Sequence, residues 1–277
     1  MNMIAANEVR VCMNEAGARR QPFLFGVDFE LSEGFFVLDP LGQQEILFEV
    51  GGVSNSPMGE GISGVLSEKM FSMNPMAYEV YREKFAVVRE GLARGDSFLL
   101  NLTVATGLDT NWTLEEIFHR AQSPYRLLVP GRFVCFSPEI FVRIKKGIIS
   151  SYPMKGTIDA TLPDAVQTLM NDGKEAAEHA TIVDLIRNDL SIVASHVRVE
   201  RYRYIDVLQT NRGPILQTSS EICGELPEDY KRQLGDILFS MLPAGSITGA
   251  PKKKTMQIIR EAEGYERGFY TGITGYF

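Results

Sequence analysis

The segment from Phe136 to Thr157 constrains the fold more than any other, because its pattern predicts a β-hairpin of defined register. Apolar side chains alternate along residues 140–144 and return at residues 148–149. Between them, Lys146-Gly147 supplies a tight turn, and glycine readily adopts the positive φ that a short hairpin loop requires. The pattern therefore predicts two antiparallel strands that pair across this turn.

The hairpin register predicts that Glu139 and Lys155 face each other where the hairpin opens. A two- or three-residue loop at this turn pairs positions whose numbers sum to 293 or 294, and these two residues sum to 294. One interpretation is a cross-strand ion pair that contributes roughly 0.2–1 kcal/mol. The other is a proton-transfer group and a nucleophile that face one substrate. On this pair alone, we favour the ion pair.

Length and composition exclude several classes of protein. The chain has 277 residues, 44% of them hydrophobic, which is enough for one large domain or two smaller ones. Its net charge of −7 argues against a nucleic-acid-binding protein. No apolar run approaches the ~20 residues of a membrane span, and the N-terminus lacks a signal peptide. Three widely spaced cysteines suit a reducing compartment. We therefore expect a cytoplasmic protein that binds neither nucleic acid nor membranes.

A helix predicted from Lys174 to about Val193 carries two carboxylates on one face. Glu175 and Glu178 are three residues apart and are therefore neighbours on the helix surface. Asp172 and Glu175 fit a capping box, which explains Glu175 structurally. Glu178 has no such explanation, and a carboxylate among small alanine residues favours a cation or a metal ion as its partner. The adjacent histidine is expected to be an ordinary packed or surface residue.

The remaining pattern predicts a mixture of strands and helices. A helix capped by Asn74 and ended by Gly95 carries an apolar stripe that we expect to pack in the core. The residues of this stripe are Tyr78, Tyr81, Phe85, Val88 and Leu92. A Gly-rich loop at residues 242–254 leads into a helix that ends near Gly264, and its exposed N–H groups are expected to attract anions. Strands are predicted at residues 23–29, 34–40, 46–50, 97–106, 125–129, 132–136, 197–207, 215–226 and 268–277.

Seven short motifs, in this order, give the chain a resemblance to a known family. They are Asn101-Leu-Thr103, Phe136-Ser-Pro-Glu139, Pro153-Met-Lys-Gly-Thr157, Glu175-Ala-Ala-Glu-His179, Val183-Asp-Leu-Ile-Arg-Asn-Asp189, Gly245-Ser-Ile-Thr-Gly-Ala-Pro-Lys252 and Gly272-Ile-Thr-Gly-Tyr276. The chain is similar to the chorismate-utilising enzymes, which include anthranilate synthase component I, aminodeoxychorismate synthase component I, isochorismate synthase and salicylate synthase. The resemblance covers residues 97–277, whereas residues 1–96 match only loosely.

This resemblance implies a fold and a domain organisation. The expected fold is α+β and anthranilate synthase component I-like, with large antiparallel sheets and helices packed outside around a central active site. Residues 1–277 would form a single chorismate-binding domain. A family member would continue beyond Phe277 with further strands, so we expect the chain to be truncated within the apolar strand at residues 268–277.

The resemblance also implies a metal ion and roles for individual residues. Glu178 matches the principal ligand of a Mg²⁺ ion that bridges to the ring carboxylate of chorismate, and Glu175 matches its neighbour. Glu139 resembles the general acid or base that serves the leaving C4 hydroxyl group. These roles suit the preference of Mg²⁺ for oxygen ligands.

Substrate contacts are implied at four further positions. Gly156 and Thr157 resemble residues whose backbone and hydroxyl group meet the ring carboxylate. Thr248 and Tyr270 match positions that line the substrate pocket, with Tyr270 facing the enolpyruvyl group.

Lys155 separates the subfamilies, because anthranilate, isochorismate and salicylate enzymes are similar to one another in carrying alanine there. A lysine at this position implies the aminase subunit of 4-amino-4-deoxychorismate synthase, in which the amine attacks C2 of chorismate and ammonia then adds at C4. A glutamine amidotransferase partner would supply the ammonia. Two alternatives remain open: anthranilate synthase component I or another chorismate-utilising enzyme, and a non-catalytic chorismate-fold fragment or binding subunit. Gln217 stands where family members usually carry a histidine, so a proton transfer through that position is in doubt.

Overall fold

A computed structural model describes residues 2–56, 70–137, 139–210 and 212–277, and the chain divides into two compact units. Unit 1 comprises Met1–Pro138, Lys231–Gly235 and Thr248–Phe277, and unit 2 comprises Glu139–Tyr230 and Asp236–Ile247. These two units are compact parts of the chain, and their existence does not test whether residues 1–277 form one domain. The single domain predicted from the sequence therefore stays a prediction. Within the described residues, no helix combines the length and the apolar character needed to cross a membrane.

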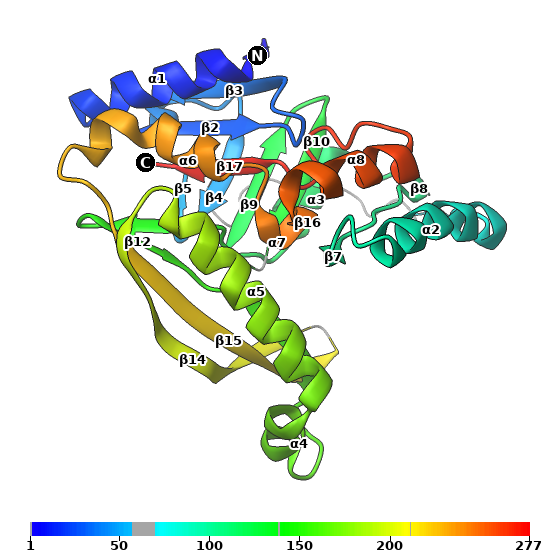
Figure 1. The fold of residues 1–277 in the computed structure, drawn as a ribbon. Helices are drawn as coiled ribbons and strands as arrows, with labels where there is room; N and C mark the ends of the chain where they lie inside the picture. The colour runs from blue at the N-terminus through cyan, green and yellow to red at the C-terminus, as the bar shows by residue number, and fades with distance from the viewer. Residues whose placement is uncertain (1, 57–69, 138, 211) are drawn as a thin grey trace. The chain divides into compact units, whose positions relative to one another are not determined.

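Unit 1 contains two antiparallel four-stranded sheets. The first has the order β1-β3-β2-β17, and helix α1 (Ala6–Arg19) lies along it (Figure 1). Its strands are β1 (Ile4–Ala5), β2 (Phe23–Val27), β3 (Glu33–Leu38) and β17 (Ile273–Tyr276). The second has the order β10-β9-β4-β5. Its strands are β4 (Leu47–Val50), β5 (Val53–Ser54), β9 (Tyr125–Val129) and β10 (Phe133–Ser137).

The core of unit 1 is formed by apolar residues from both sheets. Its fully or almost fully buried members are Leu24, Phe35, Ile46, Phe48, Leu127 and Val129. Helix α3 (Leu114–Arg120) packs against β9 and β10 and opens with a capping box of Thr113 and Glu116. A 3₁₀ turn, η1 (Pro40–Gly42), follows β3. Strand β2 is buried at every position, so protein covers both of its faces.

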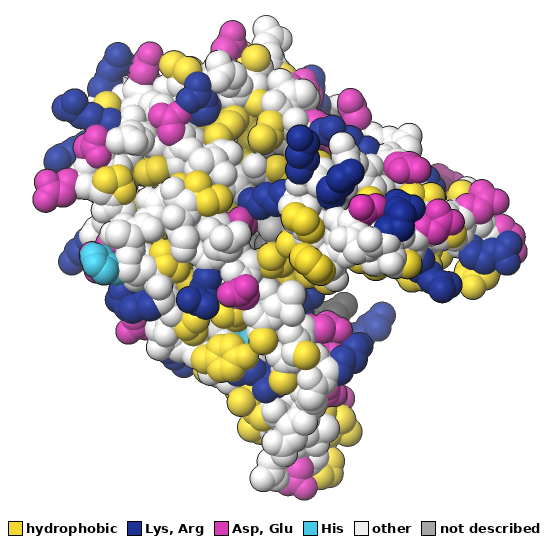
Figure 2. Space-filling view, in the orientation of Figure 1, with side chains coloured by type: hydrophobic (Ala, Val, Ile, Leu, Met, Phe, Trp, Pro, Cys, Tyr) yellow, Lys and Arg dark blue, Asp and Glu magenta, His cyan; other side chains and the backbone are white. Residues whose placement is uncertain are grey.

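Helix α2 (Tyr78–Ala93) corrects two predictions. Asn74 does not cap it, because Asn74 ends strand β6 (Phe71–Asn74), which pairs with β8 (Gly107–Thr110). The predicted stripe is not core either: Val88 is buried, but Tyr78 is 70% exposed and the other three are also exposed. Hydrophobic side chains therefore remain visible over α2 (Figure 2). The reason is a narrow packing face, on which Val88 and Gly91 meet Ile258 of α8 (Lys252–Glu263).

Unit 2 is built on one antiparallel sheet in which β15 is central. The order is β11-β12-β15-β13, and β14 also pairs with β15. The strands are β11 (Arg143–Lys145), β12 (Ile148–Ser151), β13 (Met154–Asp159), β14 (Ser195–Thr210) and β15 (Gly213–Glu225). Helices α4 (Ala165–Asn171) and α5 (Gly173–Ser191) pack on this sheet (Figure 1). Further short elements are η2 (Tyr230–Gln233), α6 (Leu234–Met241) and α7 (Gly245–Thr248). Strands β7 (Leu99–Leu100) and β16 (Gly249–Ala250) pair with each other and belong to unit 1.

The predicted hairpin forms, but it is shorter than expected. Strands β11 and β12 pair with a register sum of 293, as in Lys145↔Ile148, and both turn residues have positive φ. The prediction that Glu139 and Lys155 are cross-strand partners is wrong. Lys155 instead pairs with Thr218 of β15, because β12 and β13 both lie against β15 while β11 begins only at Arg143. The local turn was predictable, whereas this non-local pairing was not.

Candidate active site

Lys155 lies on the sheet face that packs against α5. It pairs with Thr218, whose hydroxyl group donates a hydrogen bond to the backbone carbonyl of Lys155. Opposed residues on paired strands share a face, and every second residue of β15 returns to that face, which places Ser220 beside Thr218. Lys155 itself is half-buried. Its amine is therefore carried by a strand that pairs with the central strand of the sheet, and not by a loop.

His179 of α5 is buried on this same face, which agrees with the packed alternative expected for this histidine. Its Nε2 atom lies 2.6 Å from Oγ of Ser220, which also accepts a hydrogen bond from the N–H group of Arg203. The side chain is fully buried, and its Nδ1 atom has no hydrogen-bond partner among the described residues. Burial, with smaller contributions from the charges of Arg203 and Lys155, lowers the pKa of His179 to about 4. The imidazole is therefore neutral at pH 7.

The burial of His179 could have been predicted from its position on the helix. The buried residues of α5 recur at helical spacing, and they include His179, Ile182, Val183, Ile186 and Leu190. A histidine in an otherwise apolar buried stripe must find a polar partner or carry an unsatisfied atom. Counting its position in the stripe would have predicted burial.

Glu139 has the unusual property expected of a proton-transfer group. Burial of its carboxyl group raises its pKa to about 7, and the positive charge of Lys155 opposes this rise. Glu139 as a whole is an exposed residue, so its carboxyl group is crowded by neighbouring protein atoms but is not sealed from water. The structure thus brings the charges of Glu139 and Lys155 within electrostatic range, although the two residues are not cross-strand partners.

The two α5 carboxylates occupy different surroundings. Asp172 accepts a hydrogen bond of 2.9 Å from the N–H group of Glu175, as the predicted cap requires. A Cβ atom at Gly156 would lie 3.1 Å from Oε2 of Glu175, so that carboxyl group reaches strand β13. Glu178 is exposed, and Nζ of Lys174 lies 3.7 Å from its Oε1 atom. Within the described residues, no three His, Cys, Asp or Glu side chains gather as a metal site. Two carboxylates one turn apart nevertheless suit Mg²⁺, which often takes only one or two from the protein.

A β-bulge at Gly156 separates Lys155 from Thr157. Gly156 has φ +74°, and the register shifts by one residue between its neighbours. Thr157 pairs with Gln217, whose neighbour in β15 is the partner of Lys155, so the two β13 side chains lie on opposite sheet faces. Oε1 of Gln217 is buried without a hydrogen-bond partner among the described residues. The structure therefore does not place Thr157 beside Lys155.

Thr248 and Tyr270 belong to unit 1. Thr248 is fully buried, and its carbonyl oxygen accepts a hydrogen bond of 3.3 Å from the N–H group of Asn101. Tyr270 is 63% exposed and lies in the turn that precedes β17. A third relevant position is Gly249, where φ is +115° and a Cβ atom would lie 1.8 Å from the carbonyl oxygen of Leu99. This close approach fixes the backbone next to Thr248.

One N–H group of the Gly-rich loop at residues 242–254 forms a hydrogen bond within the protein. The carboxylate of Asp189 in α5 accepts a hydrogen bond of 2.9 Å from the N–H group of Gly245. Both residues belong to unit 2, and the contact gives Asp189 a structural role. One of the N–H groups expected to attract an anion is therefore occupied by the protein's own carboxylate.

Comparison with known proteins supports the fold and the family of this chain. Residues 66–277 match a family model described as chorismate binding enzyme. An uncharacterized PabA-like protein of Haemophilus influenzae is 50% identical over 265 residues, which cover 95% of this chain and 80% of that protein. Aminodeoxychorismate synthase component 1 of Bacillus subtilis is 31% identical over 217 residues, covering 73% of this chain and 45% of that protein. The solved structure of anthranilate synthase component I from Streptococcus pneumoniae has 27% identity and a TM-score of 0.60, covering 76% and 48% of the two chains. The predicted fold class is thereby confirmed.

Proposed function

This chain belongs to the chorismate binding enzyme family, and we propose that it is the aminase subunit of 4-amino-4-deoxychorismate synthase. In this proposal it converts chorismate and ammonia to 4-amino-4-deoxychorismate, a precursor of para-aminobenzoate and folate. A glutamine amidotransferase subunit would supply the ammonia. The observation that carries the proposal is the placement of Lys155 within electrostatic range of two groups with shifted pKa values, Glu139 and His179.

The proposed nucleophile is the neutral amine of Lys155. An ordinary lysine has a pKa of about 10.4, so deprotonation at pH 7 costs roughly 4–5 kcal/mol. Neutral His179 adds no charge of its own and forms part of the buried face beside the amine.

Glu139 supplies the proton transfers. In the first step, the Lys155 nitrogen forms a bond to C2 of chorismate, the C4–O bond breaks, and protonated Glu139 gives its proton to the leaving hydroxyl group, which departs as water. In the second step, ammonia forms a bond to C4, the bond between Lys155 and C2 breaks, and the added nitrogen returns a proton to Glu139. A carboxyl group with a pKa of about 7 is populated in both forms at neutral pH, as this alternation requires.

Glu175 and Glu178 would hold Mg²⁺, which would offset the negative charge of the chorismate carboxylate. The remaining proposed substrate contacts are Gly156, Thr157 and Thr248, together with Tyr270. The carboxylate of Glu175 already reaches Gly156, which supports the assignment of these two positions to one site. The exposure of Glu178 leaves its oxygen atoms accessible to an ion and to the waters that Mg²⁺ retains.

Product identification tests this function directly. The chain is incubated with chorismate, ammonia and Mg²⁺, and the products are separated and identified by mass spectrometry. 4-Amino-4-deoxychorismate would support the proposal, and anthranilate would favour the runner-up, anthranilate synthase component I. Absence of any product under all conditions would favour a non-catalytic binding subunit.

A covalent adduct distinguishes the nucleophilic lysine from a structural one. When ammonia is withheld, the peptide that contains Lys155 should gain a substrate-derived mass, and the Lys155→Ala variant should gain none. Lys145 at the end of β11 offers a control, because it is exposed at the edge of the same sheet. Lys145→Ala should retain both the adduct and the activity. An active wild type without an adduct, together with an unimpaired Lys155→Ala variant, would show that the lysine is not the nucleophile.

A further inference from the structure

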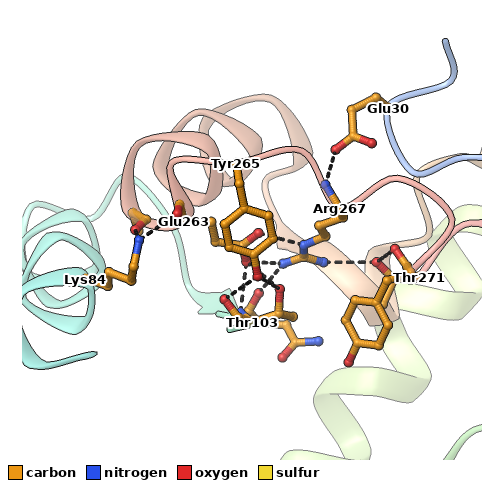
Figure 3. A network of polar contacts seen from close by, with 10 residues as sticks. Glu30, Lys84, Thr103, Glu263, Tyr265, Arg267 and Thr271 are labelled. Atoms are coloured by element: carbon orange, nitrogen blue, oxygen red, sulfur yellow. Dashed lines mark hydrogen bonds and ion pairs between the residues drawn. The ribbon is translucent and has the colours of Figure 1, made fainter. Parts of the chain in front are cut away.

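A buried ion pair between Glu263 and Arg267 lies at the C-terminal end of α8 in unit 1 (Figure 3). Nη2 of Arg267 lies 2.6 Å from Oε1 of Glu263, and Nε lies 2.9 Å from Oε2. Each side chain is 1% exposed. A bidentate arginine–carboxylate pair of this kind fixes the plane and direction of the guanidinium group.

The guanidinium group extends from this pair to two backbone segments. Its Nη2 atom donates a hydrogen bond of 2.7 Å to the carbonyl oxygen of Asn101, whose N–H group bonds the carbonyl oxygen of Thr248. Its Nη1 atom donates a hydrogen bond of 3.3 Å to the hydroxyl oxygen of Thr271. That hydroxyl group in turn donates to the carbonyl oxygen of Tyr270 at 2.6 Å. One side chain therefore connects the neighbourhoods of Thr248 and Tyr270.

Glu263 makes further hydrogen bonds besides those to Arg267, and these bonds fix the position of the ion pair in unit 1. Its Oε1 atom accepts hydrogen bonds from the N–H group and the hydroxyl group of Thr103, at 2.8 and 3.0 Å. The hydroxyl group of Tyr265 donates to the carbonyl oxygen of Thr103 at 3.1 Å. Lys84 of α2 donates to the carbonyl oxygen of Glu263 at 2.6 Å. These contacts give a structural reason for the Asn101-Leu-Thr103 motif.

The second segment needs such a tether because its backbone is strained. Thr271 has φ +59°, a conformation that β-branched residues rarely adopt. The carboxylate of Glu30 accepts hydrogen bonds from the N–H groups of Arg267 and Gly268, at 2.9 and 3.0 Å, and so fixes the start of this turn. The side-chain contact from Arg267 to Thr271 then fixes its end.

We propose that Arg267 is a positioning residue that sets the substrate-facing segments around Thr248 and Tyr270 relative to each other. The inference rests on the proposed function, because these two residues are its expected substrate contacts. Arg267 does not touch the substrate itself. It acts through the carbonyl oxygen of Asn101 and the hydroxyl group of Thr271.

Unit 1 provides a matched control for a purely stabilising ion pair. Arg126 is also buried, and it contacts Glu49 through Nε and Nη2 at 2.9 and 2.8 Å. Its Nη1 atom donates to the carbonyl oxygens of Phe118 and Ala121, at 3.2 and 3.1 Å. The chemistry matches that of the Arg267 pair, but none of these partners belongs to the segments at Thr248 and Tyr270.

The test compares Arg267→Lys with Arg126→Lys in two assays. Lysine keeps the positive charge and loses the planar fork, so both variants should lower the unfolding midpoint by similar amounts. Hydrogen–deuterium exchange should accelerate at residues 99–103, 248–250 and 268–272 only in Arg267→Lys. The same variant should raise the KM for chorismate roughly tenfold or more, while Arg126→Lys stays near the wild-type value.

Substitution of Thr271 keeps the proposal testable if Arg267→Lys does not fold. Thr271→Ser retains the hydroxyl group and should keep the wild-type KM, whereas Thr271→Val removes it and should raise the KM. Equal changes in exchange and KM for Arg267→Lys and Arg126→Lys would overturn the proposal, as would equal behaviour of the two Thr271 variants. If the wild type forms no product, the proposed function fails, and exchange still decides whether Arg267 holds the two segments.

Discussion

Burial of His179 predicts a loss of stability when the pH falls. The pKa of His179 is lowered from 6.5 to about 4, which corresponds to about 3 kcal/mol. Between these two pH values the unfolded chain binds a proton that the folded chain rejects. The free energy of unfolding therefore decreases by about 3 kcal/mol as the pH falls from 6.5 to 4. Most of this loss should disappear in a His179→Gln variant.

Glu139 gives the free energy of unfolding the opposite dependence on pH. The pH dependence of the wild type alone therefore does not isolate the contribution of His179. Its folded-state pKa of about 7 exceeds the ordinary value of 4.5. Between these values the folded chain binds more protons than the unfolded chain, and this carboxyl group lowers stability as the pH rises. The difference between wild type and His179→Gln cancels the contribution of Glu139 and isolates the imidazole.

The assay is urea unfolding at half-unit steps between pH 4 and pH 7 in buffer with a chelator, followed by far-ultraviolet circular dichroism. Hydrogen exchange of the α5 amides reports unit 2 separately. Ser220→Ala serves as a control, because burial is the largest cause of the shift and persists without the hydroxyl group. If the stability difference between wild type and His179→Gln is independent of pH, the imidazole is not protected from protonation and the reasoning is refuted.

Three further predictions concern the proposed site and its support. Glu139→Gln should lower kcat/KM by about 10²–10⁴ and remove a pH dependence centred near pH 7, which pH–rate profiles of both proteins would reveal. Glu178→Gln should weaken Mg²⁺-dependent chorismate binding without altering the fold; unchanged affinities by calorimetry would contradict its role as a ligand. Gly249→Ala should destabilise the chain by more than about 3 kcal/mol, because its Cβ atom would collide with the carbonyl oxygen of Leu99. Gly213→Ala has a similar φ of +119° with open space around it, so it measures the backbone strain alone.

Features that depend on neighbouring residues were predictable from the sequence. The Lys146-Gly147 turn set the register of β11 and β12, and Asp172 capped α5 as its spacing indicated. A positive φ at a turn is a local matter, and so is a side chain that accepts a hydrogen bond from the N–H group three residues later, because no distant part of the chain decides either of them.

Features that depend on distant partners were not predictable. The stripe on α2 has helical periodicity, but periodicity does not reveal whether another element covers the face, and Tyr78 stays exposed. Lys155 pairs with Thr218, which lies 63 positions further along the chain. The residues around Lys155 in the sequence do not indicate this partner. The hydrogen bond between His179 and Ser220 likewise joins residues 41 positions apart.

The pKa of Glu139 changes the balance between the two interpretations of its relation to Lys155. A structural ion pair stabilises the carboxylate and lowers its pKa below the ordinary value. Here the pKa is raised to about 7, because burial outweighs the attraction of the Lys155 charge. Near neutral pH the carboxyl group is therefore protonated for much of the time and is then not the anion that an ion pair requires. The loss of the cross-strand pairing removes the geometric basis of that interpretation as well. Both observations weaken the structural interpretation, and the catalytic role of Glu139 stays a prediction that the Glu139→Gln variant tests.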